Sequence, residues 1–561
     1  MKRFLIIIKN PLFVIFILSF LATWPLFLPG YFSHHDDLHV MRIFEMRKCF
    51  QDLQIPCRWV PDMGYGNGFP LYNYYSAFPY YIGALASFVF GYIGAAKLLF
   101  FIPLIFGGFS MYFLARELYG KWPGLVAAVF YLFAPYRAVD AYVRGAIAES
   151  FALALAPLVF YFLTKLAKTS GKKDFLGFAL SLGLFLTCHN IMTILFLPVI
   201  LFWGAICFWG TSLKKLLLFI LSLGLGGGIS AFFILPAFFE KKLIQSEALT
   251  RFDLDFRAHF VTIKQMFFSR FWGYGASVPG TFDGLSFQIG WPHWWMVIIF
   301  MLLLSLVLFK SFKLPFLNRD VSLRILALSC LILTVFFVSI FMLHNKSAFV
   351  WEKIGILQYA QFPWRFLSLS IFATSLLGGG VAYLIKKNTF ISIGLIILVT
   401  SLNAWYFHPK EYFFNLTDSQ KLSGTLFEDQ QKAALFDYLP KTAIESREKA
   451  PLQPIINTGV AKVQDFQNHS NYFNFVVDVE KPTRIEMPVY EFPNWQVYSN
   501  NKLISHDHKN LLGRISFNLE PGQYKIHGEF KNTLIRSLAN MISLLSLGLF
   551  IYLSYAKKLF R

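Results

Sequence analysis

An acidic pair flanked by histidines lies near the start of the chain. Residues 33–39 read Ser-His-His-Asp-Asp-Leu-His and follow directly after a long apolar run. Adjacent carboxylates repel each other, so holding them there costs free energy unless a cation, a metal ion or an acceptor hydroxyl uses them. Asp36 or Asp37 could therefore act as a general base that takes the proton from an acceptor hydroxyl. The structural alternative is a helix N-terminus whose dipole both carboxylates complement.

Basic side chains accompany the acidic pair. If a helix begins here, His35, His39 and Arg42 lie at i, i+4 and i+7 on one face, beside the carboxylates. Histidine or arginine at this place can neutralise a phosphate leaving group, so all three are candidate substrate-binding residues. The sequence gives no firm metal site. A divalent cation, Mg²⁺ or Mn²⁺, is an optional cofactor, and Asp36 and Asp37 are its candidate ligands.

The segment after this motif carries further candidates. It contains Arg58 and, at residues 64–75, an alternation of glycine and aromatic residues that includes Tyr72. Glycines and flat rings can build a platform that stacks on sugars, although interfacial tyrosine belts have the same composition. Cys49 and Cys57 share the segment and are candidates for a disulfide in an oxidising compartment.

Ionisable residues recur at the ends of later apolar runs. Asp140 and Arg144 are an i, i+4 pair if helical, with a surface ion pair as the alternative. Glu149 stands at the entry to an apolar run, where a carboxylate is hard to explain without a function, so it joins the catalytic candidates. His189, next to Asn190, is either a substrate-binding residue or half of a satisfied polar pair.

Two arginines lie beside aromatic residues, as a site for a polyprenyl-phosphate headgroup would require. Arg270 belongs to the sequence Ser-Arg-Phe-Trp-Gly-Tyr-Gly, and Gln361 and Arg365 belong to Gln-Phe-Pro-Trp-Arg. Guanidinium groups bind phosphate oxygens through paired hydrogen bonds. The alternative is that these arginines are snorkelling membrane anchors.

Composition places these motifs in a polytopic α-helical membrane protein. Of the 561 residues, 56% are hydrophobic and only 15% are charged, which is too much apolar surface for one soluble core. The long runs nearly free of charge suit helices that cross about 30 Å of hydrocarbon. We predict twelve transmembrane helices near residues 11–29, 97–116, 122–135, 150–165, 175–188, 191–209, 216–238, 294–310, 322–343, 366–385, 388–405 and 536–556.

The basic residues predict the orientation of the chain. The net charge of +20 does not indicate nucleic acid as a partner, because the basic residues punctuate the apolar runs, as the positive-inside rule expects. We therefore predict a multi-pass plasma-membrane protein with cytoplasmic termini and an extracytoplasmic active face. The first run lacks a small-residue cleavage site and is expected to stay as a signal-anchor helix. The basic groups include Lys2, Arg3, Lys9 and those in 165–173, 310–324, 386–387 and 557–561.

Three regions follow from this topology. Residues 1–405 form a transmembrane module with a long first outer loop at 30–97. Within that loop the apolar stretch 80–95 is predicted to be an interfacial or re-entrant helix, because another crossing would reverse every later loop. Residues 406–535 are polar and alternate with the β period, which predicts an extracytoplasmic, mainly-β domain, a small antiparallel β-sandwich. Residues 536–561 are the last transmembrane helix and a basic cytoplasmic tail.

The order of these features resembles the GT-C superfamily of membrane glycosyltransferases. The His-Asp-Asp-x-x-His start, Arg58-Trp59, Tyr142-x-Arg144 with Glu149, and the Gln-Phe-Pro-Trp-Arg segment are most similar to bacterial and archaeal membrane proteins described as 6-pyruvoyl-tetrahydropterin synthase-related. The resemblance implies a GT-C-like fold, a polyprenyl-phosphate-linked sugar donor and a catalytic acid at Asp36 or Asp37. The Trp-Trp-Asp signature of oligosaccharyltransferases is absent, which argues against a peptide acceptor.

The sequence thus predicts a membrane glycosyltransferase that transfers a sugar from a polyprenyl-phosphate-linked donor to an extracytoplasmic glycan, lipid or protein. One alternative is a transporter or flippase of lipid-linked glycans, and another is a non-catalytic membrane assembly protein. Transporters place ionisable groups at mid-membrane on broken helices, whereas the ionisable groups here gather at one face. That arrangement favours the enzyme.

Overall fold

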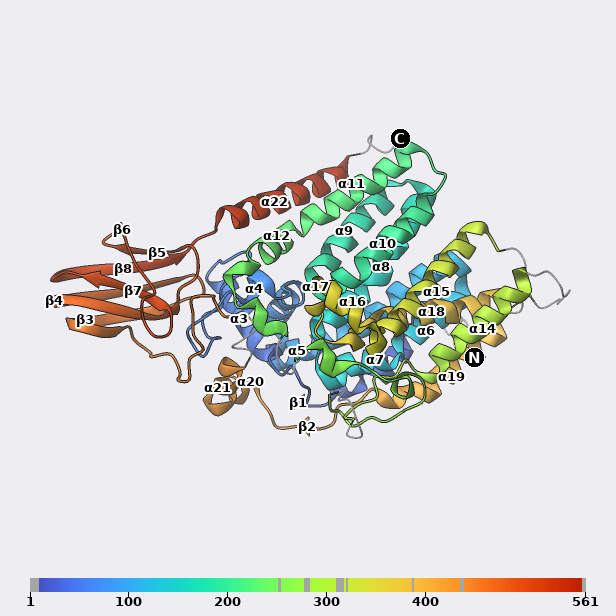
Figure 1. Ribbon diagram of the computed structural model, residues 1–561, viewed down its shortest axis with the longest axis horizontal. Coiled ribbons are helices and arrows are strands. Elements are labelled where there is room, and N and C mark those ends of the chain that lie inside the picture. Colours follow the sequence, from blue (N-terminus) through green and yellow to red (C-terminus); the bar gives the residue numbers. More distant parts are fainter. Residues whose placement is uncertain are drawn as a thin grey trace.

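The computed structural model describes residues 10–250, 254–276, 283–308, 317–318, 321–385, 388–433 and 438–556. A bundle of helices carries an antiparallel β-sheet that projects from one end, and α3 (His39–Gln51) and α4 (Leu71–Tyr74) lie between the two (Figure 1). Several basic residues of the orientation argument, including Lys2, Lys9 and those in 386–387 and 557–561, lie outside the described residues. The sidedness therefore stays a prediction.

Membrane-spanning character is confirmed, but the number of twelve spans is not. Every predicted span is helical in the described residues. Among these residues, eight helices are long and apolar enough to cross a membrane, or up to ten if each of two bent pairs is one span. The helices of the bundle are α2 (Pro11–Thr23), α5 (Phe78–Tyr119), α6 (Lys121–Leu132), α8 (Ile147–Thr169), α9 (Lys172–Cys188), α10 (Asn190–Phe208), α11 (Leu213–Ile229), α12 (Ala231–Phe239), α14 (Trp291–Leu308), α15 (Leu323–Leu343), α18 (Leu367–Leu384), α19 (Asn388–Asn403) and α22 (Leu534–Tyr555).

The predicted interfacial helix at 80–95 is joined to the span that follows it, and together they form α5. Gly91 breaks this element with a φ of 69°, a conformation that glycine adopts without strain. At the break the Asp418 carboxylate accepts the backbone N–H groups of the next two residues, at 2.7 and 2.8 Å. A Cβ at position 91 would lie 2.5 Å from Asp418 Oδ2, so this close approach also requires glycine. The two predicted helices are therefore the two halves of one bent element.

The predicted span 216–238 is also bent. α11 and α12 meet at Ser230 at an angle of 73°. The Ser543 hydroxyl of α22 accepts the Phe232 backbone N–H at 2.8 Å and so supplies a partner for a donor at the start of α12. The bend turns α12 toward α4.

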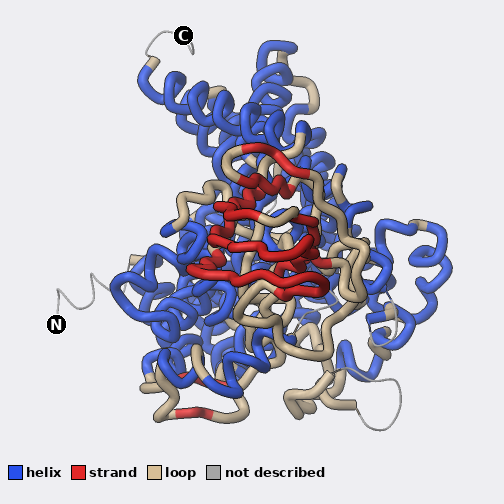
Figure 2. Tube along the Cα trace, turned by 90° about the vertical axis from the view of Figure 1, so that its left-hand side faces the viewer, coloured by secondary structure: helices blue, strands red, loops and turns tan. Residues whose placement is uncertain are grey.

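The antiparallel β character of the C-terminal region is confirmed, with one correction. The six strands belong to a single hydrogen-bonded sheet of order β3-β4-β8-β5-β6, with β7 beside β4, rather than to the two sheets of a sandwich (Figure 2). The reason is the length of β4, which pairs with β8 through residues 472–479 and with β7 through 483–490. The strands are β3 (Ile455–Asn468), β4 (Tyr472–Tyr490), β5 (Trp495–Ser499), β6 (Lys502–Ile504), β7 (Arg514–Leu519) and β8 (Gly522–Phe530).

The chain between α19 and the sheet returns to the segment that follows α2. Here β2 (Tyr412–Phe413) pairs with β1 (Tyr31–Phe32), and α20 (Asp418–Lys421) and α21 (Gly424–Lys432) follow. The strands of the sheet thus begin at Ile455, well inside the predicted segment 406–535. The predicted disulfide joins Cys49 to Cys57, with a Cα–Cα distance of 5.6 Å.

Candidate functional site

The acidic loop, residues 33–38, lies against the segment 139–144. The backbone N–H groups of His35 and Asp36 donate to the carbonyl oxygens of the last two residues of that segment, each at 2.9 Å. The segment is a π-helix, η2 (Val139–Arg144), a rare form that is frequent at functional sites. Two parts of the chain that are far apart in sequence therefore form one wall.

The helix after the acidic pair begins later than predicted. α3 starts at His39, so His35, His39 and Arg42 do not share one helical face. His39 is buried, its Nδ1 accepts from the Tyr80 hydroxyl at 3.0 Å, and its Nε2 donates to the Gly145 carbonyl oxygen. Burial lowers the pKa of His39 to about 3, so the ring is neutral and can donate and accept at once. His39 therefore anchors α3.

Each carboxylate of the acidic pair has a cationic partner. Asp36 Oδ2 accepts from the Arg42 guanidinium at 2.7 Å. Burial acts to raise the pKa of the Asp36 carboxyl, but the charge and hydrogen bond of Arg42 hold this pKa below its usual value of 3.8, and the group is ionised at neutral pH. Asp37 Oδ2 accepts from the Lys421 ammonium, while Asp37 Oδ1 is buried and has no hydrogen-bond donor.

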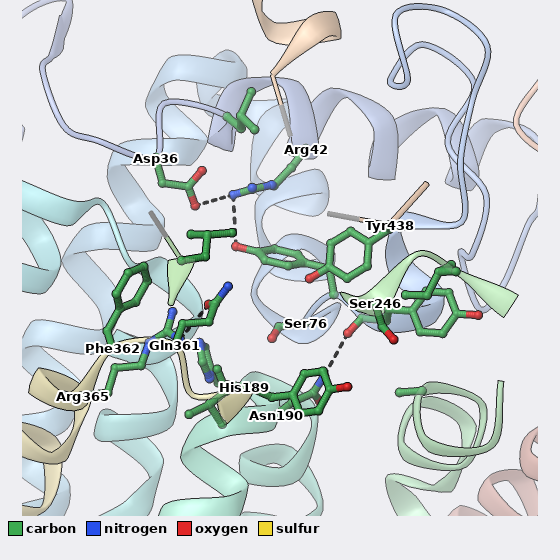
Figure 3. A pocket seen from close by; sticks show the side chains of 18 of the residues that line it. Asp36, Arg42, Ser76, His189, Asn190, Ser246, Gln361, Phe362, Arg365 and Tyr438 are labelled. Atoms are coloured by element: carbon green, nitrogen blue, oxygen red, sulfur yellow. Dashed lines mark hydrogen bonds and ion pairs between the residues drawn. The ribbon is translucent and has the colours of Figure 1, made fainter. Parts of the chain in front are cut away.

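A cavity of about 1460 Å³ opens beside the acidic pair. In Figure 3, Asp36 and Arg42 lie on one side of it, and His189, Gln361 and Arg365 lie opposite. His35 and Asp37 also line it. The remaining wall is largely apolar and includes Leu186, Ile191, Ile194, Ile234, Ala237 and Phe238 from α9, α10 and α12. The cavity thus joins a charged surface to apolar side chains of the bundle.

A buried network stands behind the arginine of the cavity. Glu149 is fully buried, and its Oε1 accepts from the Tyr136 hydroxyl at 2.6 Å and from the Ser368 hydroxyl at 3.1 Å. Its Oε2 accepts from Arg144 at 2.8 Å and lies 3.7 Å from Arg365 Nε. Glu149 does not line the cavity. Its carboxylate instead forms an ion pair with Arg365, which does.

Asp140 completes this network. Its Oδ1 accepts from Arg144 at 2.6 Å, and its side chain is fully buried. Two carboxylates, Asp140 and Glu149, therefore face two guanidinium groups, Arg144 and Arg365. Removing one member of this set leaves an uncompensated charge in the interior.

Comparison with known families identifies the chain. Residues 72–408 match the family described as 6-pyruvoyl-tetrahydropterin synthase related domain, membrane protein. The chain belongs to this family. The resemblance seen in the sequence is thereby confirmed. The family match includes the Glu149 network and Arg365, whereas Asp36, Asp37 and Lys421 lie outside it.

Two solved structures are similar to this family member at low identity. The arabinofuranosyltransferase AftD from Mycobacteria is 15% identical with a TM-score of 0.43, and the likeness covers 74% of this chain and 28% of that chain. The oligosaccharyltransferase of Archaeoglobus fulgidus, solved with a tethered acceptor peptide, is 13% identical with a TM-score of 0.36, covering 73% of this chain and 54% of that one. This chain therefore spans under a third of the length of AftD. The search of curated proteins gives no match.

Six predicted substrate-binding residues of this family member do not line the cavity. His39, Asp140 and Arg144 have the buried contacts described above, and the other three are Arg58, Tyr72 and Arg270. Arg58 donates to the Asn540 side chain of α22 at 2.7 Å. The Tyr72 hydroxyl donates to the Arg42 carbonyl oxygen at 2.6 Å, and Arg270 donates to a backbone carbonyl of α19 at 2.6 Å. Through these hydrogen bonds the three residues connect elements of the fold.

Other cavity residues were not predicted from the sequence. Lys421 lies in the segment predicted to be a β-domain, yet its side chain reaches Asp37. A capping box of Thr417 and Gln420 starts α20 and was visible as Thr-x-x-Gln, but it predicts only a helix start. Lys241 and Tyr359 also line the cavity, with the Lys241 ammonium 3.2 Å from the ring centre. No local sequence pattern predicts contacts between segments that are so far apart in the chain.

The acidic pair does not have the ligand set of a metal site. Within the described ranges, no group of three or more His, Cys, Asp or Glu side chains is placed to hold a metal ion. Asp36 and Asp37 would also have to exchange Arg42 and Lys421 for the ion. One or two carboxylates together with water and phosphate oxygens can nevertheless hold Mg²⁺, so a divalent cation at Asp36 and Asp37 stays a prediction. The reaction below uses protein groups alone.

Proposed function

We propose that this chain is a glycosyltransferase that moves a sugar from a polyprenyl-phosphate-linked donor to an extracytoplasmic acceptor. The observation that carries the proposal is the cavity, which combines the ionised Asp36 carboxylate, the Arg365 guanidinium and an apolar wall. The carboxylate can act as a base, the guanidinium can bind a phosphate, and the apolar wall can hold a lipid tail.

The proposed reaction is a displacement at the anomeric carbon of the sugar. Asp36 takes the proton of the acceptor hydroxyl as that oxygen forms a bond to the anomeric carbon. The bond from this carbon to the phosphate oxygen breaks, and polyprenyl phosphate leaves with the electron pair. Attack opposite the leaving group inverts the anomeric configuration. Asp36 is preferred to Asp37 as the base because Asp37 has one oxygen buried and the other bound by Lys421.

Arg365 stabilises the departing phosphate in this scheme. Its Nη1 donates to the Ala360 carbonyl oxygen at 2.8 Å and to Gln361 Oε1 at 3.1 Å, which orients the guanidinium before the donor binds. His189 Nδ1 accepts the Met192 backbone N–H at 3.3 Å, so its Nε2–H is the ring donor that remains for the cavity. Both groups act on the charge that develops on the leaving oxygen.

Replacing Arg365 tests the donor site. We expect Arg365→Ala to lower kcat/KM for the lipid-linked donor about 100-fold, because one charged donor to the transition state is worth roughly 3 kcal/mol. Transfer is measured with purified full-length chain in lipid nanodiscs and a labelled polyprenyl-phosphate sugar. Arg270→Ala is the matched control, since this arginine lies outside the cavity.

Three results would contradict the proposal. An equal kcat/KM for Arg365→Ala and wild type would show that Arg365 does not bind the donor. Transfer from a nucleotide sugar would show that the donor is wrong. Movement of the lipid-linked sugar across proteoliposomes, without a new glycosidic bond, would favour the flippase.

The pH dependence of transfer reports on Asp36. Because Arg42 holds the pKa of Asp36 below 3.8, the base is ionised above that pH, and the rate should fall only as the pH drops through the lowered pKa. We expect Arg42→Gln to raise this pKa and to move the acidic limb of the pH–rate profile to higher pH. Arg42→Lys keeps the charge and should stay closer to wild type. An acidic limb that is identical in all three proteins would show that the ionisation of Asp36 does not control the rate.

A further inference from the structure

A row of aromatic rings crosses the solvent face of the β-sheet. Tyr472 of β4 lies 6.2 Å from His527 of β8, and His527 lies 6.1 Å from Tyr498 of β5, measured between ring centres. His469, just before β4, stacks on Tyr472 at 4.2 Å with ring planes 12° apart. The row, defined as these four residues, thus joins three neighbouring strands.

The row belongs to the face of the sheet that the domain core does not use. On β4, the residues that alternate with Tyr472, such as Phe473 and Phe475, are buried in the core. His527 and Tyr498 are cross-strand partners on the same outer face. The His527 side chain is 43% exposed. Cross-strand stacking helps the sheet, but rings that served only packing would not need a solvent-facing position.

Polar side chains surround the rings. His527 Nδ1 shares a hydrogen bond with Asn474 Oδ1 at 2.7 Å, and the Tyr498 hydroxyl donates to Gln496 Oε1 at 2.6 Å. Lys531 donates to the Tyr498 hydroxyl at 2.9 Å and pairs with Glu529 at 3.3 Å. Neighbouring rings of the row are tilted by 37° and 34°. A row of rings edged by hydrogen-bonding groups matches a sugar chain, which presents C–H faces to rings and hydroxyls to polar atoms.

The row is tied to the wall of the cavity. Asp52, which ends α3, accepts from the His469 ring at 2.8 Å and from the Ser470 backbone N–H at 2.7 Å. The first turn of the same helix carries Arg42, which holds Asp36. α3 has 13 residues and is therefore about 20 Å long. A chain of a few sugars can bridge this distance.

We infer that the aromatic row is an acceptor-binding subsite, and that the acceptor is an oligosaccharide or polysaccharide chain. The role of this subsite in catalysis rests on the proposed function. The growing end of the glycan lies at Asp36 while sugars further along the chain stack on Tyr472, His527 and Tyr498. The subsite favours long acceptors over short ones and takes no part in the chemical step.

The experiment compares acceptors of different length. Purified full-length chain in nanodiscs is given the labelled polyprenyl-phosphate sugar and either monosaccharides or hexasaccharides of one sugar series. In wild type we expect KM for the hexasaccharide to be at least tenfold below that for the monosaccharide. Tyr472→Ala/Tyr498→Ala and, separately, His527→Ala should lose most of this advantage and keep the monosaccharide rate. Asp478→Ala, exposed on β4 outside the row, is the control and should behave as wild type.

The outcomes separate the two proposals. Hexasaccharide binding is also measured directly, without donor, by titration of the same proteins. If wild type transfers sugar but the row variants keep the full length advantage, the subsite is wrong and the glycosyltransferase stands. If wild type transfers nothing yet binds the hexasaccharide through the row, the proposed function fails and the binding site stands. Equal binding by wild type and both row variants overturns the subsite. Retained monosaccharide transfer, or an unchanged thermal midpoint, shows that the variants fold.

Discussion

Asp36→Asn is expected to lower kcat for sugar transfer by about 10³-fold while leaving the donor KM within a few-fold of wild type. The reason is that a general base contributes roughly 10²- to 10⁴-fold, and an amide cannot accept the acceptor proton. Asparagine keeps the size of the side chain and one oxygen for the Arg42 guanidinium, so the loop 33–38 retains its backbone contacts with η2. Transfer is measured from a labelled lipid-linked sugar under single-turnover conditions, which isolate the chemical step.

Two further variants test whether this loss is specific to Asp36. Asp62→Asn removes a carboxylate from the same outer loop that pairs with Lys48 outside the cavity, and it should transfer at nearly the wild-type rate. Asp37→Asn breaks the contact with Lys421 and should cost less than Asp36→Asn, because Asp37 positions the loop. If Asp36→Asn kept full activity and Asp37→Asn abolished it, the base would be Asp37 and the present assignment would be wrong.

Glu149→Ala should cause the largest loss of stability among single changes at the site. It removes a fully buried carboxylate that faces Arg144 and Arg365, and breaking a buried ion pair by removing one partner typically costs about 3–5 kcal/mol. The Tyr136 and Ser368 hydroxyls also lose their acceptor. We expect a lower thermal midpoint of the purified protein and, in the fraction that folds, a raised KM for the lipid-linked donor as Arg365 loses its support.

Glu117→Ala is the matched control for this loss. Glu117 pairs with Lys168 at 2.8 Å, and both side chains are partly exposed to solvent. Surface ion pairs contribute about 0–1 kcal/mol, so the thermal midpoint should change little. Equal midpoints for Glu149→Ala and Glu117→Ala would show that the buried network does not stabilise the bundle. Glu149→Gln, which can keep an oxygen for the two hydroxyls, should lie between the two.

The class of the protein and the places of unusual chemistry along the chain could be predicted from local sequence patterns. Runs without charge identify helices in a bilayer because an unpaired charge or peptide group is costly there, and this constraint acts on each run separately. Alternation along β4 likewise follows from local geometry. The acidic pair and the arginine beside aromatic residues at 361–365 were visible because such residues are rarely placed next to apolar runs without a reason.

Which of these groups meet can be seen only in the folded chain. Lys421 reaches Asp37 from a distant segment, and Glu149 supports Arg365 from behind the cavity rather than lining it. Arg58 and Arg270 have the same local sequence character as Arg365, yet their hydrogen bonds join elements of the fold. The physical reason is that the partners and burial of a side chain depend on contacts between remote segments, whereas hydropathy and periodicity report only on neighbours along the chain.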